Sequence, residues 1–459
     1  MPESAKRFIF DGYRHAPEAS QVFFDYAVEL MDGTMEKFTE TIEVPGATAQ
    51  AWARIPADLL ERLLRNLSLA LGTSYWKMRC APQIEIRGFA LNEKQAAFWN
   101  QVYTQGLGEF FFKNQIDFRG LVEFPSEERI ERTAASATSH FAVRDSRCLV
   151  PVGGGKDSLV SVELLRERDF DFELFTLSTS RIQEQVMEVV GKPVVSLKRQ
   201  IDPRLIELSK TDAVWNGHIP ITTVYMFAGL LAAALRGCSY VVFSNEASAN
   251  EGNVEYLGLD INHQWSKSLQ AELLIREYIK ENITPDIVPF SLLRPLSEIG
   301  IVRRFVKCPK YFSVFSSCNR NFVVGSAKPV AGRGAYWCGS CPKCAFVFAL
   351  LSAYLPKQTL LDIFGRDLYA DAGLVPVYRD LLGRGAMKPF ECVGTPEETA
   401  LAMHLAQATG EYGGAVMEYF VHETEADFDY ATLQKKLFSL ADLSTIPEEF
   451  RPVYEQRHP

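Results

Sequence analysis

The chain has 459 residues, of which 47% are hydrophobic and 23% charged, so its composition is that of a globular protein with two or three domains. Its net charge of −9 argues against nucleic-acid binding, unless basic residues gather in one patch. We find no run of about 18 apolar residues and no apolar signal core near the N-terminus. We therefore expect a cytoplasmic protein with no membrane partner, whose nine cysteines stay reduced. The sequence leaves the oligomeric state open.

The first 140 residues predict an N-terminal α+β domain. Residues 22–30 and 36–44 alternate between apolar and polar side chains, which indicates two strands joined by a turn. Residues 55–70 have the spacing of an amphipathic helix, and residues 93–114 form a second helical stretch that is rich in aromatic side chains.

Residues 141–345 predict a parallel sheet flanked by helices, because strand and helix patterns alternate along them. The expected strands are 148–152, 172–177, 193–197 and 240–244, and the expected helices are 156–168, 183–190 and 222–235. Residues 346–459 predict a mostly helical C-terminal region, which includes helices over 345–354, 396–408 and 430–440. The expected fold class is therefore α/β, with an α+β domain before the sheet and helices after it.

The most informative segment joins the first strand of this sheet to its helix. It consists of Gly153, Gly154, Gly155, Lys156, Asp157 and Ser158. Glycines let the backbone approach a ligand closely, and a helix N-terminus favours anions, so the segment predicts a phosphate-binding loop. The glycine spacing fits neither the Walker A pattern nor the dinucleotide fingerprint. The alternative is an ordinary strand-to-helix turn.

A second motif is the C-x-x-C-x-x-C of Cys338, Cys341 and Cys344. Three thiolates at this spacing can converge on one cation, and tetrahedral Zn²⁺ needs one more ligand. Cys318 is the preferred fourth ligand and Cys308 the alternative. An iron–sulfur cluster would use the same ligands, and free buried thiols remain the simplest alternative.

Two polar segments follow the last expected strand of the sheet, where parallel sheets bind their ligands. The first contains Glu246 and Glu251, which can hold Mg²⁺ or act as bases, or can simply face solvent. The second contains His263, which titrates near neutrality, and Lys267, which can pair with a carboxylate or a phosphate. His218 is a weaker candidate in a turn.

The glycine segment resembles the PP-loop, S-G-G-x-D-S, of the N-type ATP pyrophosphatases, with Gly153 where that family has serine. The resemblance implies an adenine-nucleotide α-hydrolase-like fold that cleaves ATP between its α and β phosphates and leaves AMP on a substrate oxygen. It implies that Lys156 and Ser158 contact the phosphates and that Asp157 lies near Mg²⁺. The cysteine motif resembles the zinc site of PP-loop enzymes that make 7-cyano-7-deazaguanine.

Several segments together resemble one PP-loop family, the MurL epimerases, which act on UDP-N-acetylmuramoyl-L-alanyl-L-glutamate. These segments are residues 72–77, 152–158, 250–253, 262–268 and 337–346. The resemblance implies that the chain adenylates the terminal L-Glu carboxylate of UDP-MurNAc-L-Ala-L-Glu, inverts the α-carbon and releases AMP and pyrophosphate, in peptidoglycan precursor synthesis. His263, Lys267 and Glu251 are then the candidates for proton transfer and carboxylate orientation, beside Asp157.

Two more segments have competing interpretations. Tyr75, Trp76 and Lys77 would help to hold the UDP-sugar, although a core Tyr/Trp pair explains the aromatic residues equally well. Arg294 lies in a segment that resembles the R-P-L sequence found after the substrate loop of PP-loop proteins.

Three other functions compete with the epimerase. A PP-loop amide ligase or nitrile synthase would also adenylate a carboxylate, and would then let ammonia attack it. A tRNA-modifying PP-loop enzyme would bind RNA in a salt-dependent way, against the acidic balance of the chain. A non-catalytic nucleotide-binding module would release no pyrophosphate from ATP.

Overall fold

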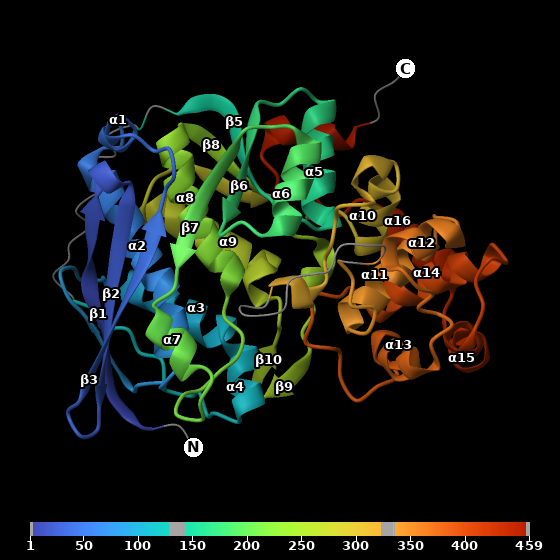
Figure 1. The fold of residues 1–459 in the computed structure, drawn as a ribbon, viewed down its shortest axis with the longest axis horizontal. Coiled ribbons are helices and arrows are strands. Elements are labelled where there is room, and N and C mark those ends of the chain that lie inside the picture. Colours follow the sequence, from blue (N-terminus) through green and yellow to red (C-terminus); the bar gives the residue numbers. More distant parts are fainter. Residues whose placement is uncertain (1–2, 128–140, 142, 323–333, 335, 456–459) are drawn as a thin grey trace.

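The computed structural model describes residues 3–127, 141, 143–322, 334 and 336–455, and shows a mixed α/β fold built on one nine-stranded sheet (Figure 1). The strand order is β11-β8-β5-β6-β7-β3-β2-β1-β4. The strands are β1 (Ala5–Ala16), β2 (Gln21–Leu30), β3 (Met35–Glu43), β4 (Gln83–Ile86), β5 (Arg144–Pro151), β6 (Phe172–Leu177), β7 (Val194–Gln200), β8 (Cys238–Phe243) and β11 (Val288–Ser291). The five strands from β11 to β7 are parallel, as expected for the central region.

The N-terminal strands β1, β2 and β3 form an antiparallel meander that is continuous with the parallel sheet. The turn between β2 and β3 uses Gly33 at φ +86°, a conformation that glycine adopts without strain. β3 then pairs with β7, and a buried ion pair between Arg199 and Glu40 (2.6 Å) joins the two strands. One hydrophobic core therefore holds both Phe10 of β1 and Phe175 of β6. The predicted domain boundary at residue 140 falls on residues outside those described.

The central strands are buried on both faces, as parallel strands usually are. Successive side chains point to opposite faces, so Leu149 and Val241 lie in one core while Val150 and Val242 lie in the other. The helices of the first core are α2 (Ala57–Trp76), α3 (Glu93–Gly106), α8 (Ile221–Arg236) and α9 (Leu269–Asn282). The helices of the second core include α5 (Lys156–Glu167), α6 (Arg181–Val190) and α10 (Glu298–Phe305).

Capping residues determine where the helices that flank this sheet begin and end. At the start of α6, the Ser180 and Gln183 side chains each accept a hydrogen bond from the other residue's backbone N–H, which forms a capping box. The same helix ends at Gly191 with φ +68°, and α8 ends at Gly237 with φ +66°. These helices match the expected stretches 183–190 and 222–235 to within two residues.

The C-terminal region is helical, as predicted, and lies to the right of the sheet in Figure 1. Its helices are α11 (Pro342–Ser352), α12 (Lys357–Phe364), α13 (Val375–Leu381), α14 (Pro396–Ala408), α15 (Ala415–Glu423) and α16 (Tyr430–Phe438). The chain then returns to the sheet, where Phe450 packs against Phe290 of β11 at 4.8 Å between ring centroids. Among the residues described, no helix is both long and apolar enough to cross a membrane.

Candidate active site

The glycine loop lies between β5 and α5, and Gly155 is the N-cap residue directly before the helix. Gly154 has φ +89°, and a Cβ there would lie 2.8 Å from the Ile182 side chain. A Cβ on Gly155 would lie 2.7 Å from the Ser317 hydroxyl oxygen. Position 154 therefore requires glycine, whereas a side chain at position 155 would displace the Ser317 hydroxyl, against which the loop is packed.

The first turn of α5 carries a buried ion pair. The Lys156 ammonium is fully buried and pairs with the carboxylates of Asp157 and Glu298. Burial alone would lower the pKa of Lys156, but the two carboxylates outweigh it and raise that pKa above its usual value. The Asp157 side chain is 26% exposed, so its carboxylate is the charged group of the pair with access to solvent. A contact between Lys156 and phosphate stays a prediction.

Two more buried acids lie near this ion pair. Burial, reinforced by the charges of Glu298 and Asp157, raises the pKa of Glu246 to about 7. Burial and the charge of Glu298 likewise raise the pKa of Glu398 to about 8. A carboxyl group that titrates near neutral pH can act as an acid or a base, so Glu246 is better suited to proton transfer than an exposed glutamate.

Arg294 is hydrogen-bonded to both polar segments. Its guanidinium, 4% exposed, donates to the carbonyl oxygens of Glu246 (2.7 Å) and Lys267 (2.8 Å). It also pairs with the Glu272 carboxylate of α9 at 2.6 Å. Arg294 therefore positions both polar segments, and its charge is already compensated within the protein.

A carboxylate–imidazole pair lies between the N-terminal region and the second polar segment. The short helix α4 (Gly108–Asn114) carries Glu109, whose carboxylate is hydrogen-bonded to His263 Nδ1. Burial alone would lower the pKa of His263, but Cys392 and Glu109 raise it to about 9. The ring centroids of His218 and His263 lie 4.7 Å apart. Burial and the positive charge of His263 lower the pKa of His218 to about 3.

Cys392, from the segment between α13 and α14, completes this group. The Lys267 ammonium donates to its sulfur at 3.2 Å, and the His263 side chain is hydrogen-bonded to it. Lys343 donates from its ammonium to the Cys392 carbonyl oxygen. Burial alone would raise the pKa of the Cys392 thiol, but Lys267, His263 and Lys343 lower it to about 5. Glu109 and Cys392 were both missed by the sequence analysis.

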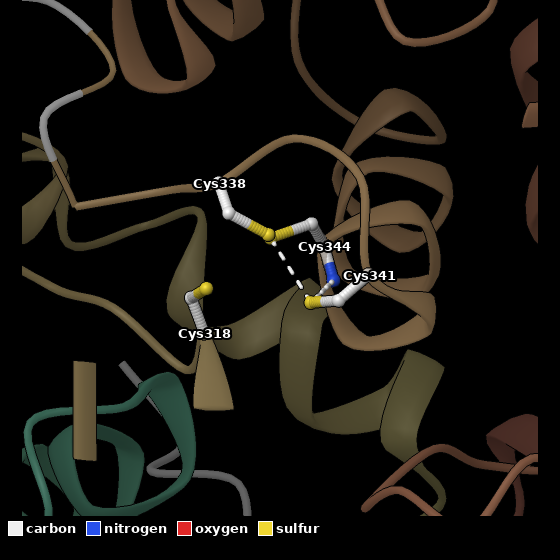
Figure 2. A group of neighbouring side chains, drawn as sticks. All are labelled: Cys318, Cys338, Cys341 and Cys344. Carbon is white, nitrogen blue, oxygen red and sulfur yellow. Dashed lines mark hydrogen bonds between the residues drawn. The ribbon is translucent and has the colours of Figure 1, made fainter. Parts of the chain in front are cut away.

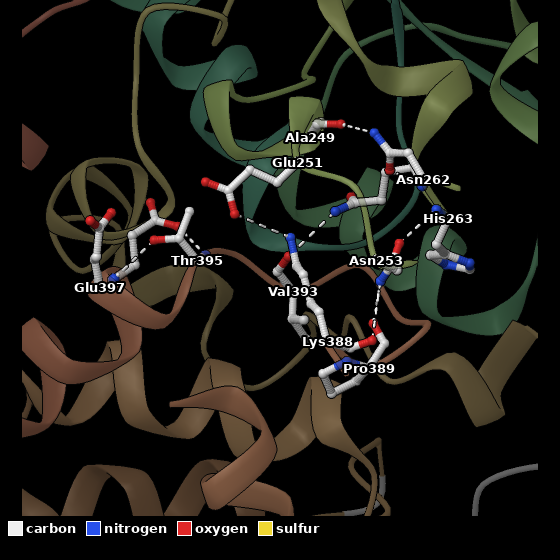
Figure 3. A network of polar contacts seen from close by, with 12 residues as sticks. Ala249, Glu251, Asn253, Asn262, His263, Lys388, Pro389, Val393, Thr395 and Glu397 are labelled. Carbon is white, nitrogen blue, oxygen red and sulfur yellow. Dashed lines mark hydrogen bonds and ion pairs between the residues drawn. The ribbon is translucent and has the colours of Figure 1, made fainter. Parts of the chain in front are cut away.

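The structure does not bring Glu251 into this group. Its side chain is 48% exposed and lies 3.7 Å from the Lys388 ammonium (Figure 3). In the same view, the Asn253 amide accepts from the backbone N–H of His263 (2.8 Å) and donates to the Pro389 carbonyl oxygen (2.9 Å). This polar segment therefore fixes the chain that leads to Cys392.

The four cysteines of the predicted metal site come together. Figure 2 shows Cys318, on a separate segment, facing the other three. The four sulfur atoms lie within 4.8 Å of one another, and they belong to Cys318, Cys338, Cys341 and Cys344. Cys308 is not in this group. Four converging thiols match the donor set of a closed, tetrahedral zinc site, and Zn²⁺ itself stays a prediction.

The aromatic pair in the last turn of α2 belongs to the core. Tyr75 and Trp76 are fully buried, and Tyr75 stacks on Tyr26 with ring centroids 4.6 Å apart. The Lys77 ammonium donates to the Gly217 carbonyl oxygen. The core interpretation of Tyr75 and Trp76 is therefore confirmed.

Comparison with known proteins places this site in a family. Residues 1–292 match the family model described as the MurL N-terminal domain, and residues 314–435 match the MurL C-terminal domain. A UDP-N-acetyl-alpha-D-muramoyl-L-alanyl-L-glutamate epimerase of Xanthomonas oryzae pv. oryzae is 39% identical over 412 residues, which cover 90% of this chain and 87% of the relative.

Two further relatives carry the same name. The protein of Micromonospora sp. is 37% identical over 398 residues, or 87% of this chain and 86% of its own length. The protein of Salinispora tropica is 37% identical over 410 residues, or 89% of this chain and 85% of its own length. On these matches, which run through nearly all of the described sheet, the glycine loop and both cysteine groups, the chain belongs to the MurL family.

Proposed function

We propose that this chain is an ATP-dependent epimerase that converts the terminal L-Glu of UDP-MurNAc-L-Ala-L-Glu to D-Glu during peptidoglycan precursor synthesis. The observation that carries the proposal is its identity of 37–39% to three epimerases of that name over 87–90% of the chain. A cytoplasmic location belongs to the same proposal, since ATP is supplied there.

The glycine loop is the proposed site of ATP, in the manner of a PP-loop. No side chain caps the first turn of α5, so its backbone N–H groups are available to an anion. The Ser317 hydroxyl, beside Gly155, is buried and has no hydrogen-bond partner among the described residues. The Ser158 hydroxyl, at the same end of the helix, donates to the Gly155 carbonyl oxygen (3.1 Å) and would turn from it to reach a phosphate. These donors fit phosphate oxygens.

Adenylation would solve the main chemical problem of the reaction. The α-proton beside a carboxylate is very hard to remove, because the resulting carbanion places two negative charges together. An acyl-adenylate has no carboxylate charge, and its carbonyl can accept the electron pair as an enolate that hydrogen bonds stabilise. A base then takes the α-proton, an acid returns a proton to the opposite face, and water releases AMP.

Two metal ions belong to the proposal. Asp157, whose carboxylate reaches solvent, would hold Mg²⁺, which neutralises phosphate charge and the leaving pyrophosphate. The cysteine cluster would hold Zn²⁺ as a closed structural site that joins Cys318 to the start of α11.

The decisive experiment mixes the purified chain with ATP, Mg²⁺ and UDP-MurNAc-L-Ala-L-Glu. We expect AMP and pyrophosphate in equal amounts, and D-Glu after hydrolysis and chiral analysis of the product. The variant Asp157→Asn, which keeps the shape of the side chain, should lose both products together. ADP in place of AMP, or glutamate that stays entirely in the L form, would refute the proposal.

A further inference from the structure

Two distant parts of the chain meet at the sulfur of Cys392, and a third part supports one of them. Lys267 comes from the segment after β10 (Leu259–Ile261), and its ammonium lies 3.2 Å from that sulfur. His263 comes from the same segment and is held by Glu109 of the N-terminal region. Cys392 itself lies in the C-terminal region and is partly exposed. A ligand that reaches Cys392 would therefore meet a thiol with two cations in contact.

We infer that Cys392 is a catalytic residue of the proposed epimerisation: its thiolate takes the α-proton of the activated glutamyl residue, while Lys267 and His263 stabilise the charged sulfur. The inference rests on the proposed function and assigns its base.

The charges around the Cys392 sulfur favour the thiolate form that a base requires. Lys267, His263 and Lys343 face Cys392 as cations, and Glu391 is the neighbouring acid, whose carboxylate accepts the Lys343 backbone N–H at 2.7 Å. With pKa values of about 5 for Cys392 and about 9 for His263, the first is a thiolate and the second an imidazolium at neutral pH.

The proton balance closes with water, which the proposed reaction already uses. The α-proton moves to the Cys392 sulfur as the C–H electron pair enters the acyl carbonyl and forms an enolate. A water molecule then gives a proton to the other face of the α-carbon, and the enolate electron pair forms the new C–H bond. The hydroxide that is left takes the proton from the Cys392 thiol, which restores the thiolate and water.

Two neighbouring contacts connect the pair to the substrate. Lys267 interacts electrostatically with both Cys392 and Asp157, so the pair lies close to the proposed adenylation site. The Gln264 amide donates to the Val393 carbonyl oxygen (3.4 Å), but its own oxygen is buried and has no partner among the described residues. A buried acceptor beside Cys392 suits the glutamyl amide N–H, which adjoins the reacting carbon.

The first test separates adenylation from proton transfer. In Cys392→Ala and Cys392→Ser we expect uptake of solvent deuterium at the glutamyl α-carbon to fall at least ~100-fold, because an acid–base group contributes that much. Exchange of labelled pyrophosphate into ATP should persist within about threefold, because adenylation needs no α-proton transfer. Cys308→Ala is the matched control, since Cys308 is also partly exposed but burial raises the pKa of its thiol.

The outcomes distinguish this inference from the proposed function. Wild-type deuterium uptake in Cys392→Ala would overturn the inference alone. No substrate-dependent pyrophosphate exchange in the wild-type protein would overturn the proposed function itself.

A second test uses the wild-type protein, so it does not depend on how a variant folds. Iodoacetamide at pH 6.5 should alkylate Cys392 at least ~10 times faster than Cys308 by peptide mapping, because the thiolate is the nucleophile. Substrate should protect Cys392, and the alkylated protein should lose deuterium uptake while it keeps pyrophosphate exchange. A glutamyl thioester on Cys392, detected by mass, would instead make it a nucleophile and overturn the assignment as a base.

Discussion

The two cysteine groups of this protein use the same atom in opposite surroundings. In the zinc-type cluster, sulfur faces sulfur, with 3.5 Å between Cys341 and Cys344 and 3.6 Å between Cys338 and Cys344. At Cys392, the sulfur faces the ammonium of Lys267 and the imidazole of His263. Four thiolates can approach this closely only around a cation, whereas Cys392 is stabilised as a thiolate by protein cations alone.

The comparison shows that the neighbours of a cysteine, rather than its burial, decide its chemistry. Cys148 and Cys238 are buried within the sheet, and burial raises the pKa of both thiols far above the usual value. Without the neighbouring cations, burial would raise the pKa of the Cys392 thiol as well. Each prediction below therefore removes what stabilises one of the two cysteine groups.

The largest effect is expected from Cys341→Ser. Structural Zn²⁺ contributes about 10–16 kcal/mol to the folding of small zinc peptides, and the cluster ties the segment of Cys318 to α11. We expect the variant to lose its bound zinc, measured by elemental analysis, and to unfold at a clearly lower temperature. Cys308→Ser, outside the cluster, should keep both. Wild-type protein that is free of metal yet equally stable would contradict the structural role.

The next effect concerns Lys267→Met, which removes the cation nearest the Cys392 sulfur while keeping most of the side-chain volume. The pKa of Cys392 should rise, so less thiolate is present, and we expect deuterium uptake at pH 6 to fall about 100-fold, or about 2.7 kcal/mol. The deficit should shrink toward pH 8.5 as thiolate returns. Lys267→Arg keeps the charge and should retain most activity; a pH-independent deficit in Lys267→Met would argue against this role.

Much of the fold was predictable from local patterns. β6 begins and ends at the predicted residues, and α14 covers the predicted stretch 396–408. The helices α9 and α10 were not predicted, because charged residues interrupt their apolar spacing. Two of those charges are in fact buried, Glu272 and Glu298, and their partners Arg294 and Lys156 come from other segments. Sequence spacing cannot show such pairing in advance.

The two cysteine groups also differ in how far the sequence predicts them. Three ligands of the zinc-type cluster lie three residues apart, so spacing alone pointed to them, and Cys318 followed as the nearest cysteine. Cys392 has no such spacing and acquires its neighbours only on folding. Glu109 left one sequence signal, a single acid before three consecutive phenylalanines, because an acid in an apolar helical turn needs a buried partner.

The smallest effect is a pH dependence of stability. The Cys392 thiol has a depressed pKa of about 5 in the folded chain, against about 8.5 when unfolded, so its contribution is lost as pH falls toward 5. His263 has a raised pKa of about 9, against about 6.5 when unfolded, so its contribution is complete below 6.5 and is lost as pH rises toward 9.

Together the two groups make the free energy of unfolding depend on pH below pH 6.5, but not between pH 6.5 and 8.5. Between pH 5 and 6.5, Cys392 has lost its proton in the folded chain but keeps it in the unfolded chain, and His263 is protonated in both. The free energy of unfolding should therefore rise by about 1.4 kcal/mol per pH unit, which is about 2 kcal/mol over this range. Between pH 6.5 and 8.5 both states have lost one proton and the two contributions cancel. Urea unfolding of the wild type and of the double variant Cys392→Ala, His263→Asn should therefore differ by a margin that grows up to pH 6.5 and then stays constant. Parallel curves from pH 5 to 8.5 would show that the thiolate–imidazolium pair does not form.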